Sequence, residues 1–212
     1  MRVVAHPFEP DDFVGGHVAL DFTNTVTERD SEVPVDWLDG YPRLIEWAQM
    51  AGLLEKGVAA RLLADGERSP REAAGTLGRA RRLREALHDA CTALLAGRTV
   101  PADALAELES AWKRTATRGR LTSGAGQLRL APDAESSGLD LPLDLVMFES
   151  LGLLAELDLD RTRACRGDHC GWLFIDTSKS GRRVWCDMAT CGNAAKSQRF
   201  ARAARKRRRD QR

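Results

Sequence analysis

Four cysteines near the C-terminal end constrain this 212-residue chain more than any other feature. Four residues separate Cys165 from Cys170, four separate Cys186 from Cys191, and fifteen lie between the two pairs. A glycine follows the second cysteine of each pair and allows the backbone conformation that a tight turn needs. Zn²⁺ prefers four tetrahedral ligands, which two closely spaced pairs of thiolates can supply. We therefore predict one Zn²⁺ per chain, bound by these four cysteines.

The cysteines also allow roles that do not involve a four-thiolate zinc site. Disulfides are less favoured because nothing marks the chain as secreted, and paired cysteines in cytosolic proteins more often bind metal. A zinc site that responds to oxidation is a second alternative. His169 could replace one cysteine as a ligand, although four thiolates already complete the shell. The remaining cysteine, Cys91, is expected to be a small buried apolar side chain.

The two ends of the chain differ strongly in charge, although the net charge is only +1. Residues 161–212 contain fifteen Lys and Arg against four Asp and Glu, whereas residues 1–160 contain seventeen against twenty-seven. We therefore predict an acidic N-terminal domain, residues 1–160, and a basic zinc module, residues 161–212. A basic segment of this kind is a candidate for binding a polyanion, with a solvated tail beyond residue 207 as the alternative.

The expected location is the cytoplasm, and no membrane partner is expected. The sequence has no apolar run near the roughly eighteen residues that a membrane-spanning helix needs. Its first residues also lack the apolar stretch of a secretory signal.

Apolar residues at helical spacing predict an α+β protein whose N-terminal domain is mainly helical with a few short strands. The predicted helices cover residues 42–52, 56–65, 69–96, 101–117 and 142–157. Ser69 is expected to cap the third of them through its side chain. A hairpin or single strand is expected at residues 121–130, followed by a polar loop at 133–140.

In the segment from Gly15 to Val26, Val18, Leu20 and Phe22 alternate with smaller or polar residues, which predicts a half-buried strand or a short extended segment. Asp21, Asn24 and Thr25 lie within it and are candidates for a ligand pocket. A hydrogen-bonded network or a helix cap is the interpretation that the residues favour. The arginines between residues 79 and 84 are expected to form a solvated helix face. Because no set of catalytic residues or phosphate-binding loop is evident, we do not expect an enzyme.

The sequence between the cysteine pairs predicts a β-hairpin, in which residues 172–176 pair with residues 182–185 across a turn. Trp172 and Trp185 are expected in its small core. Metal binding should supply much of the folding free energy of so small a module. An alanine-rich helix begins near Gly192, so the module is expected to resemble a treble clef.

Basic residues occupy one half of this last helix, and Phe200 lies toward the other half. Lys and Arg on an exposed helix face would neutralise DNA phosphates. The residues expected to contact DNA are Arg182, Arg183, Lys196, Arg199, Arg202, Arg205 and Lys206.

The C-terminal motif resembles the CGNR zinc-finger family, through the two cysteine pairs, Phe174, Asp176, the run 183–186 and the run 191–193. The preceding residues resemble the ABATE domain, through Gly16 and residues 19–25. This resemblance implies a bacterial, stress-related transcription regulator that binds zinc and DNA. One departure is Ala194, where the motif has arginine.

The function expected from sequence is therefore zinc-dependent binding of duplex DNA in transcription regulation. An RNA-binding zinc protein, which could stack bases on Trp172 and Trp185, is one alternative. A redox-responsive zinc switch or a protein-interaction module is another. A small-molecule effector of the N-terminal domain and a homodimer are further partners that this interpretation allows.

Overall fold

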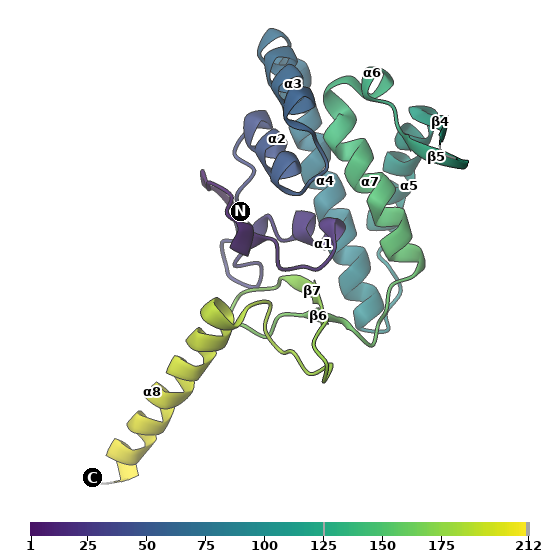
Figure 1. Cartoon of the computed structure of the whole chain (residues 1–212). Coiled ribbons are helices and arrows are strands. Elements are labelled where there is room, and N and C mark those ends of the chain that lie inside the picture. Colours follow the sequence, from purple (N-terminus) through teal and green to yellow (C-terminus); the bar gives the residue numbers. More distant parts are fainter. Residues whose placement is uncertain (125, 211–212) are drawn as a thin grey trace.

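A computed structural model gives the structure of this chain, with the backbone of residues 1–124 and 126–210 and the side chains of residues 1–123 and 126–201 described (Figure 1). Five long helices build the N-terminal domain, and their ends lie within three residues of the predicted ones. They are α2 (Tyr41–Met50), α3 (Lys56–Arg68), α4 (Pro70–Leu95), α5 (Ala102–Thr117) and α7 (Leu141–Ala155). The predicted α+β class and the mainly helical domain are thus confirmed.

Helix α4 runs the length of this domain, with α2 and α3 on one side and α5 and α7 on the other (Figure 1). Its apolar face places Leu83 and Leu87 in a core that also contains Trp47 and Met147. Pro70 suits the first turn of a helix because that turn leaves its N–H groups unpaired. Among the described atoms the Ser69 side chain makes no capping bond, so that detail of the prediction is wrong; its backbone carbonyl accepts from Ala73 N at 3.0 Å.

The segment predicted as a strand is instead a short helix, α1 (Val18–Thr23). His17 begins it, because the Nδ1 atom of His17 accepts a hydrogen bond from Ala19 N at 3.2 Å. The buried positions of α1 follow helical spacing and are Ala19, Leu20, Phe22 and Thr23. The strand prediction failed because alternation over three residues matched a strand as well, while tertiary burial decided for the helix.

Three short strands within the first 36 residues form a small sheet. The sheet order is β1–β3–β2, with β1 parallel and β2 antiparallel to the central strand. The strands are β1 (Arg2–Val3), β2 (Val26–Thr27) and β3 (Val35–Asp36). A 3₁₀ turn, Pro10–Asp12, precedes α1.

A hairpin of β4 (Gly119–Gly124) and β5 (Gln127–Pro132) lies where a hairpin or strand was expected. The polar segment after it is more ordered than the predicted loop. It forms a short helix, α6 (Ala134–Ser137), and a 3₁₀ turn (Gly138–Asp140) that leads into α7.

The zinc module contains a strand pair, but its partners differ from the prediction. Strand β7 (Leu173–Ile175) pairs antiparallel with β6 (Thr162–Ala164), which precedes the first cysteine. Residues 182–185, the predicted partner, do not form a strand in the described structure. Asp176 is the physical reason, because its carboxylate accepts from Ser178 N at 2.9 Å and Arg183 N at 2.7 Å and turns the chain away from β7.

A π-helical turn, Met188–Gly192, leads directly into α8 (Asn193–Asp210). Figure 1 shows α8 projecting from the zinc module, away from the helical domain. In the described part of the chain, no helix is both long and apolar enough to cross a membrane.

Candidate metal centre

The four cysteines converge on one point. Their sulfur atoms all lie within 4.8 Å of one another. The Sγ atom of Cys186 lies 3.8 Å from that of Cys170 and 3.7 Å from that of Cys191. These distances are far longer than the ~2.05 Å of a disulfide. They match the edge of about 3.8 Å that a tetrahedron with Zn–S bonds of ~2.3 Å requires.

Two backbone turns present the four sulfurs. The first turn, residues 165–171, is called the first knuckle. Cys165 N donates to Trp172 O at 2.7 Å, and Cys170 N donates to Gly167 O at 3.2 Å. Gly167 is required at this turn, because a Cβ atom there would lie 2.7 Å from the Sγ atom of Cys191.

The second turn contains Cys186 and Cys191 and starts α8. Asp187 immediately precedes the π-helical turn and caps its start, because the Asp187 carboxylate accepts a hydrogen bond from Thr190 N at 2.7 Å. Cys191 lies inside that turn, one residue before Gly192, and Gly192 N donates to Asp187 O at 3.0 Å. The direction of α8 is therefore tied to the last metal ligand.

The donor set fits Zn²⁺ chemically. Gly167 N and Cys186 N each donate to the Sγ atom of Cys165 at 3.3 Å, as backbone amides do around bound thiolates. Hydrogen bonds from the neighbouring thiols lower the pKa of Cys165, whereas the pKa values of Cys170 and Cys186 are raised by the sulfurs around them. Four adjacent thiolates need a cation, and Zn²⁺ supplies one while deprotonating its ligands.

His169 does not join the sulfur cluster. The described groups that could hold a metal at this centre are the four cysteines. His169 is exposed and has a positive φ of 60°, and its Nδ1 atom lies 3.2 Å from Asp30 O. Its place in the first knuckle is therefore that of a turn residue in contact with the N-terminal domain.

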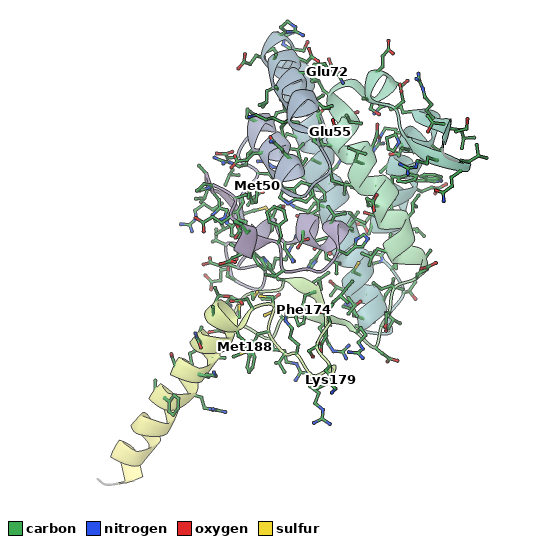
Figure 2. All side chains as sticks on the ribbon, viewed as in Figure 1. Met50, Glu55, Glu72, Phe174, Lys179 and Met188 are labelled. Atoms are coloured by element: carbon green, nitrogen blue, oxygen red, sulfur yellow. The ribbon has the colours of Figure 1, made fainter. Side chains whose placement is uncertain are left out.

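Aromatic side chains form the core beside the metal centre. Trp172 is buried, donates through Nε1 to Val26 O at 2.8 Å, and packs edge-on against Trp37. Figure 2 shows Phe174 inside the module, whereas Lys179 at the following turn points to solvent. Trp172 is thus enclosed and does not offer an open face for stacking a base.

The residues expected to contact DNA have different surroundings. Lys196 and Arg199 are exposed on the first turns of α8, and Arg182 is exposed on the zinc module. Ala194, where the family motif has arginine, is exposed as well. Arg183 is half-buried, with its guanidinium 4.5 Å from the centre of the Phe174 ring and its Nε donating to Trp185 O at 2.9 Å. The side chains of Arg202, Arg205 and Lys206 lie outside the described residues. Phe200 is 69% exposed.

The three candidates for a ligand pocket each make hydrogen bonds. The Asp21 carboxylate accepts from Gly15 N at 2.7 Å, and burial raises its pKa to about 6. Both amide atoms of Asn24 bond to the backbone of Leu173, at 2.9 Å each. The Thr25 hydroxyl donates to Phe22 O at 2.8 Å. A ligand pocket at these residues stays a prediction.

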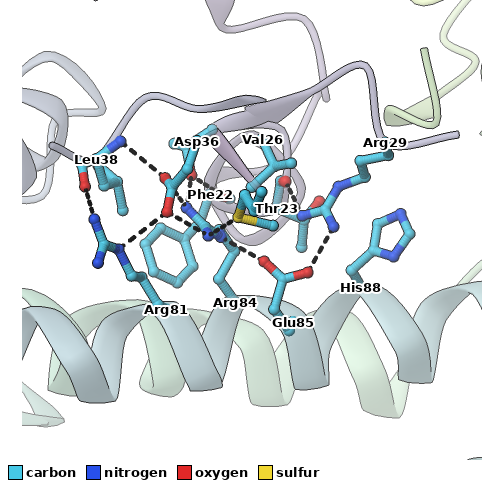
Figure 3. A network of polar contacts seen from close by, with 12 residues as sticks. Phe22, Thr23, Val26, Arg29, Asp36, Leu38, Arg81, Arg84, Glu85 and His88 are labelled. Carbon is cyan, nitrogen blue, oxygen red and sulfur yellow. Dashed lines mark hydrogen bonds and ion pairs between the residues drawn. The ribbon is translucent and has the colours of Figure 1, made fainter. Parts of the chain in front are cut away.

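A buried network of charges was missed from sequence (Figure 3). Arg84 is only 1% exposed, which corrects the prediction of a solvated arginine face. Its guanidinium bonds to both oxygens of Asp36, at 2.6 and 3.0 Å, and its Nε bonds to Glu85 at 2.8 Å. Glu85 in turn pairs with Arg29 at 2.7 Å. The burial of Arg84 was predictable from sequence, because residue 84 continues the helical spacing of the apolar residues Ala80, Leu87 and Cys91.

The fold and the cysteine cluster together define a zinc-binding protein with a helical N-terminal domain. Residues 16–163 match the family model ABATE, described as "Putative stress-induced transcription regulator", and residues 161–209 match the CGNR zinc finger. The first match covers more than half of the chain. The chain therefore belongs to the ABATE family and carries a CGNR zinc finger. A search of curated proteins found no match.

Proposed function

We propose that this chain is a zinc-dependent transcription regulator whose zinc centre positions α8 on duplex DNA. One observation carries the proposal. The last metal ligand, Cys191, lies in the turn Met188–Gly192 that starts α8, and α8 stands clear of the helical domain (Figure 1). A metal centre that aims a free helix is suited to place that helix in a groove.

The charge of α8 supports DNA as the partner. Its 18 residues contain eight Lys and Arg against one Asp. At ~1.5 Å per residue the helix is about 27 Å long, enough to cross the major groove. Lys196 and Arg199 lie near its start, where the metal centre defines its position best. Ala194 removes one cation of the family motif, and these two residues are the nearest replacements on α8.

The same geometry leads us to propose a binding protein rather than an enzyme. Four thiolates complete the tetrahedral shell of Zn²⁺ and leave no open position for a substrate. The metal would therefore act structurally, and a regulator of this kind would work in the cytoplasm. The N-terminal domain would act as the sensor or dimerisation domain.

One surface of the N-terminal domain supports self-association. Leu121 faces Leu130 across the β4–β5 hairpin, and Leu128 lies two residues from Leu130 on the same strand face. All three are exposed, Leu128 by 75%. A homodimer and a small-molecule effector stay predictions.

Salt dependence tests the DNA proposal. Each phosphate contact adds about −0.9 to the slope of log affinity against log salt concentration. We expect the Lys196→Ala, Arg199→Ala double variant to bind a random duplex more weakly and with a slope shallower by about 1.8. Fluorescence anisotropy of a labelled duplex between about 50 and 200 mM salt measures both. Lys56→Ala, which removes an exposed cation from the start of α3 in the N-terminal domain, is the matched control.

Two results would contradict the proposal. One is an unchanged slope in the double variant, because the contacts then lie elsewhere. The other is preference for single-stranded RNA over duplex DNA in direct competition, which would favour the RNA alternative.

A further inference from the structure

The zinc module and the N-terminal domain share a buried core. Leu173 of β7 is 0% exposed and packs with residues that belong to three helices of the N-terminal domain. These residues are Ala19 and Leu20 of α1, Cys91 of α4 and Leu153 of α7. Burial raises the pKa of the Cys91 thiol to about 11, as expected for a thiol in an apolar site. The two family regions therefore meet across a packed interface.

Asn24 joins the two regions by a pair of buried hydrogen bonds. Its Nδ2 donates to Leu173 O, its Oδ1 accepts from Leu173 N, and both distances are 2.9 Å. Asn24 is 1% exposed and lies 149 residues from Leu173 in sequence. A side-chain amide has one donor end and one acceptor end, which match the N–H and C=O of a single strand residue. Asn24 thus acts toward β7 as a short additional strand would.

Two more hydrogen bonds hold β7 on both sides of Leu173. Trp172 Nε1 donates to Val26 O at 2.8 Å, and Ile175 N donates to Gly15 O at 2.8 Å. Gly15 itself is bonded to the Asp21 carboxylate. The residues of the ABATE motif around positions 15–26 therefore surround the strand that follows the first knuckle.

The first knuckle also rests on the N-terminal domain. Arg29 N donates to Cys170 O at 3.3 Å, and His88 Nε2 lies 3.1 Å from Gly171 O. The contact is so close that a Cβ atom on Gly171 would lie 2.6 Å from the Cβ atom of Arg29. Gly171 also has a φ of +68°, which favours glycine. This turn is thus shaped to fit against Arg29.

Arg29 connects the knuckle to the buried charge network. Its side chain is 7% exposed, donates to Thr23 O at 2.6 Å and pairs with Glu85. Glu85 and Asp36 both bond to Arg84 (Figure 3). A continuous chain of hydrogen bonds therefore runs from β3, through α4, to the backbone of a metal ligand.

We propose that Asn24 and Arg29 are positioning residues for the zinc centre, so that zinc binding and folding of the N-terminal domain form one cooperative unit. Groups outside the metal shell that orient the ligands typically change metal affinity about 10- to 100-fold when they are removed. Because coupling is reciprocal, zinc must stabilise the N-terminal domain by the amount that this domain strengthens zinc binding. A conformational change in the N-terminal domain would thereby alter zinc binding, and with it the position of the start of α8.

Zinc release from the Asn24→Ala full-length protein tests the coupling. We expect its zinc affinity, measured by competition with a chromogenic chelator, to fall by about 10- to 100-fold. Thr115→Val is the matched control. It removes a buried hydrogen bond of 2.9 Å to Asp144, between α5 and α7, and should lower the unfolding midpoint without changing zinc affinity. Equal zinc affinity in Asn24→Ala and Thr115→Val would overturn the proposal.

A second variant and a second readout cover the case in which Asn24→Ala does not fold. Trp172→Phe keeps an aromatic ring and removes the bond to Val26 O, so zinc affinity should fall by a smaller factor. In the wild type, stripping zinc should speed amide hydrogen exchange in α1 and β2 as well as in residues 161–192. Faster exchange confined to residues 161–210 would overturn the proposal. None of these readouts involves DNA, so their outcome is independent of whether the proposed function is correct.

Discussion

Cys186→Ser should abolish stoichiometric zinc binding and unfold the zinc module. Cys186 is 1% exposed, and its Sγ atom lies within 3.8 Å of two other ligand sulfurs. Serine places a harder and more weakly coordinating oxygen at this position, where Zn²⁺ prefers thiolate. Structural zinc supplies roughly 10–16 kcal/mol of apparent binding free energy in small zinc modules, so its loss exceeds what the module's own core can replace. Zinc content by mass spectrometry, after dialysis against a weak chelator, measures the effect.

Cys91→Ala is the matched control for this variant. Cys91 is the fifth cysteine, equally buried but outside the sulfur cluster. Its loss leaves a small cavity and should cost about 1 kcal/mol of stability while zinc stays at one per chain. Retention of one zinc per chain by Cys186→Ser would show that the ligand set is wrong.

Asp36→Ala should strongly destabilise the N-terminal domain. Asp36 and Arg84 are each 1% exposed and form a two-bonded ion pair. Removing Asp36 leaves the buried Arg84 guanidinium with the Glu85 carboxylate, which also pairs with Arg29, in place of two carboxylates. Breaking a buried ion pair in this way costs about 3–5 kcal/mol. At roughly 2–4 °C per kcal/mol for a chain of this size, the unfolding midpoint should fall by roughly 6–20 °C. Calorimetry of the zinc-saturated full-length protein measures the shift.

Two further variants give this prediction its controls. Asp39→Ala removes a partly exposed aspartate of the same segment, whose oxygen lies 3.6 Å from Arg43, and should cost at most about 1 kcal/mol. Asp36→Ala combined with Arg84→Met removes both buried charges and should recover part of the loss. If Asp36→Ala and Asp39→Ala unfold at the same temperature, the buried pair does not stabilise the domain as described.

Much of the architecture follows from local sequence signals. The five long helices were predictable because their apolar residues recur at helical spacing over ten residues or more. The cysteine pairs predicted the metal centre because the chemistry of zinc restricts which residues, and how many, can bind it. The start of α8 was predictable from its alanine-rich composition after Gly192. Each of these signals lies within a short stretch of sequence.

The features that sequence did not reveal depend on distant contacts. β7 pairs with β6 rather than with residues 182–185 because Asp176 captures two backbone amides and redirects the chain. Arg84 lies in a run of arginines, and its burial depends on a two-bonded partner, Asp36, that is 48 residues away in sequence. From sequence alone, Asn24 was a candidate for a ligand pocket, a hydrogen-bonded network or a helix cap. The structure shows that it bonds to the backbone of Leu173, 149 residues away.

The four cysteines have a second role besides binding the metal, because they also connect the zinc module to the N-terminal domain. They converge on one metal centre, but the first knuckle also rests on Arg29 and His88 of the N-terminal domain. The start of α8 is therefore connected to the N-terminal domain indirectly, through the metal centre and the first knuckle. We expect this arrangement to make DNA binding depend on zinc.

The most direct test of that dependence is an anisotropy titration of one duplex pool with wild-type protein before zinc removal, after removal and after return of one equivalent. Without zinc, α8 loses its fixed start and must be ordered on binding, which weakens association. We predict salt-dependent binding by the zinc form, weakening by about tenfold or more on removal, and recovery with one equivalent of Zn²⁺. Equal affinity in all three states, or no duplex binding by the zinc form at about 50 mM salt, would contradict it.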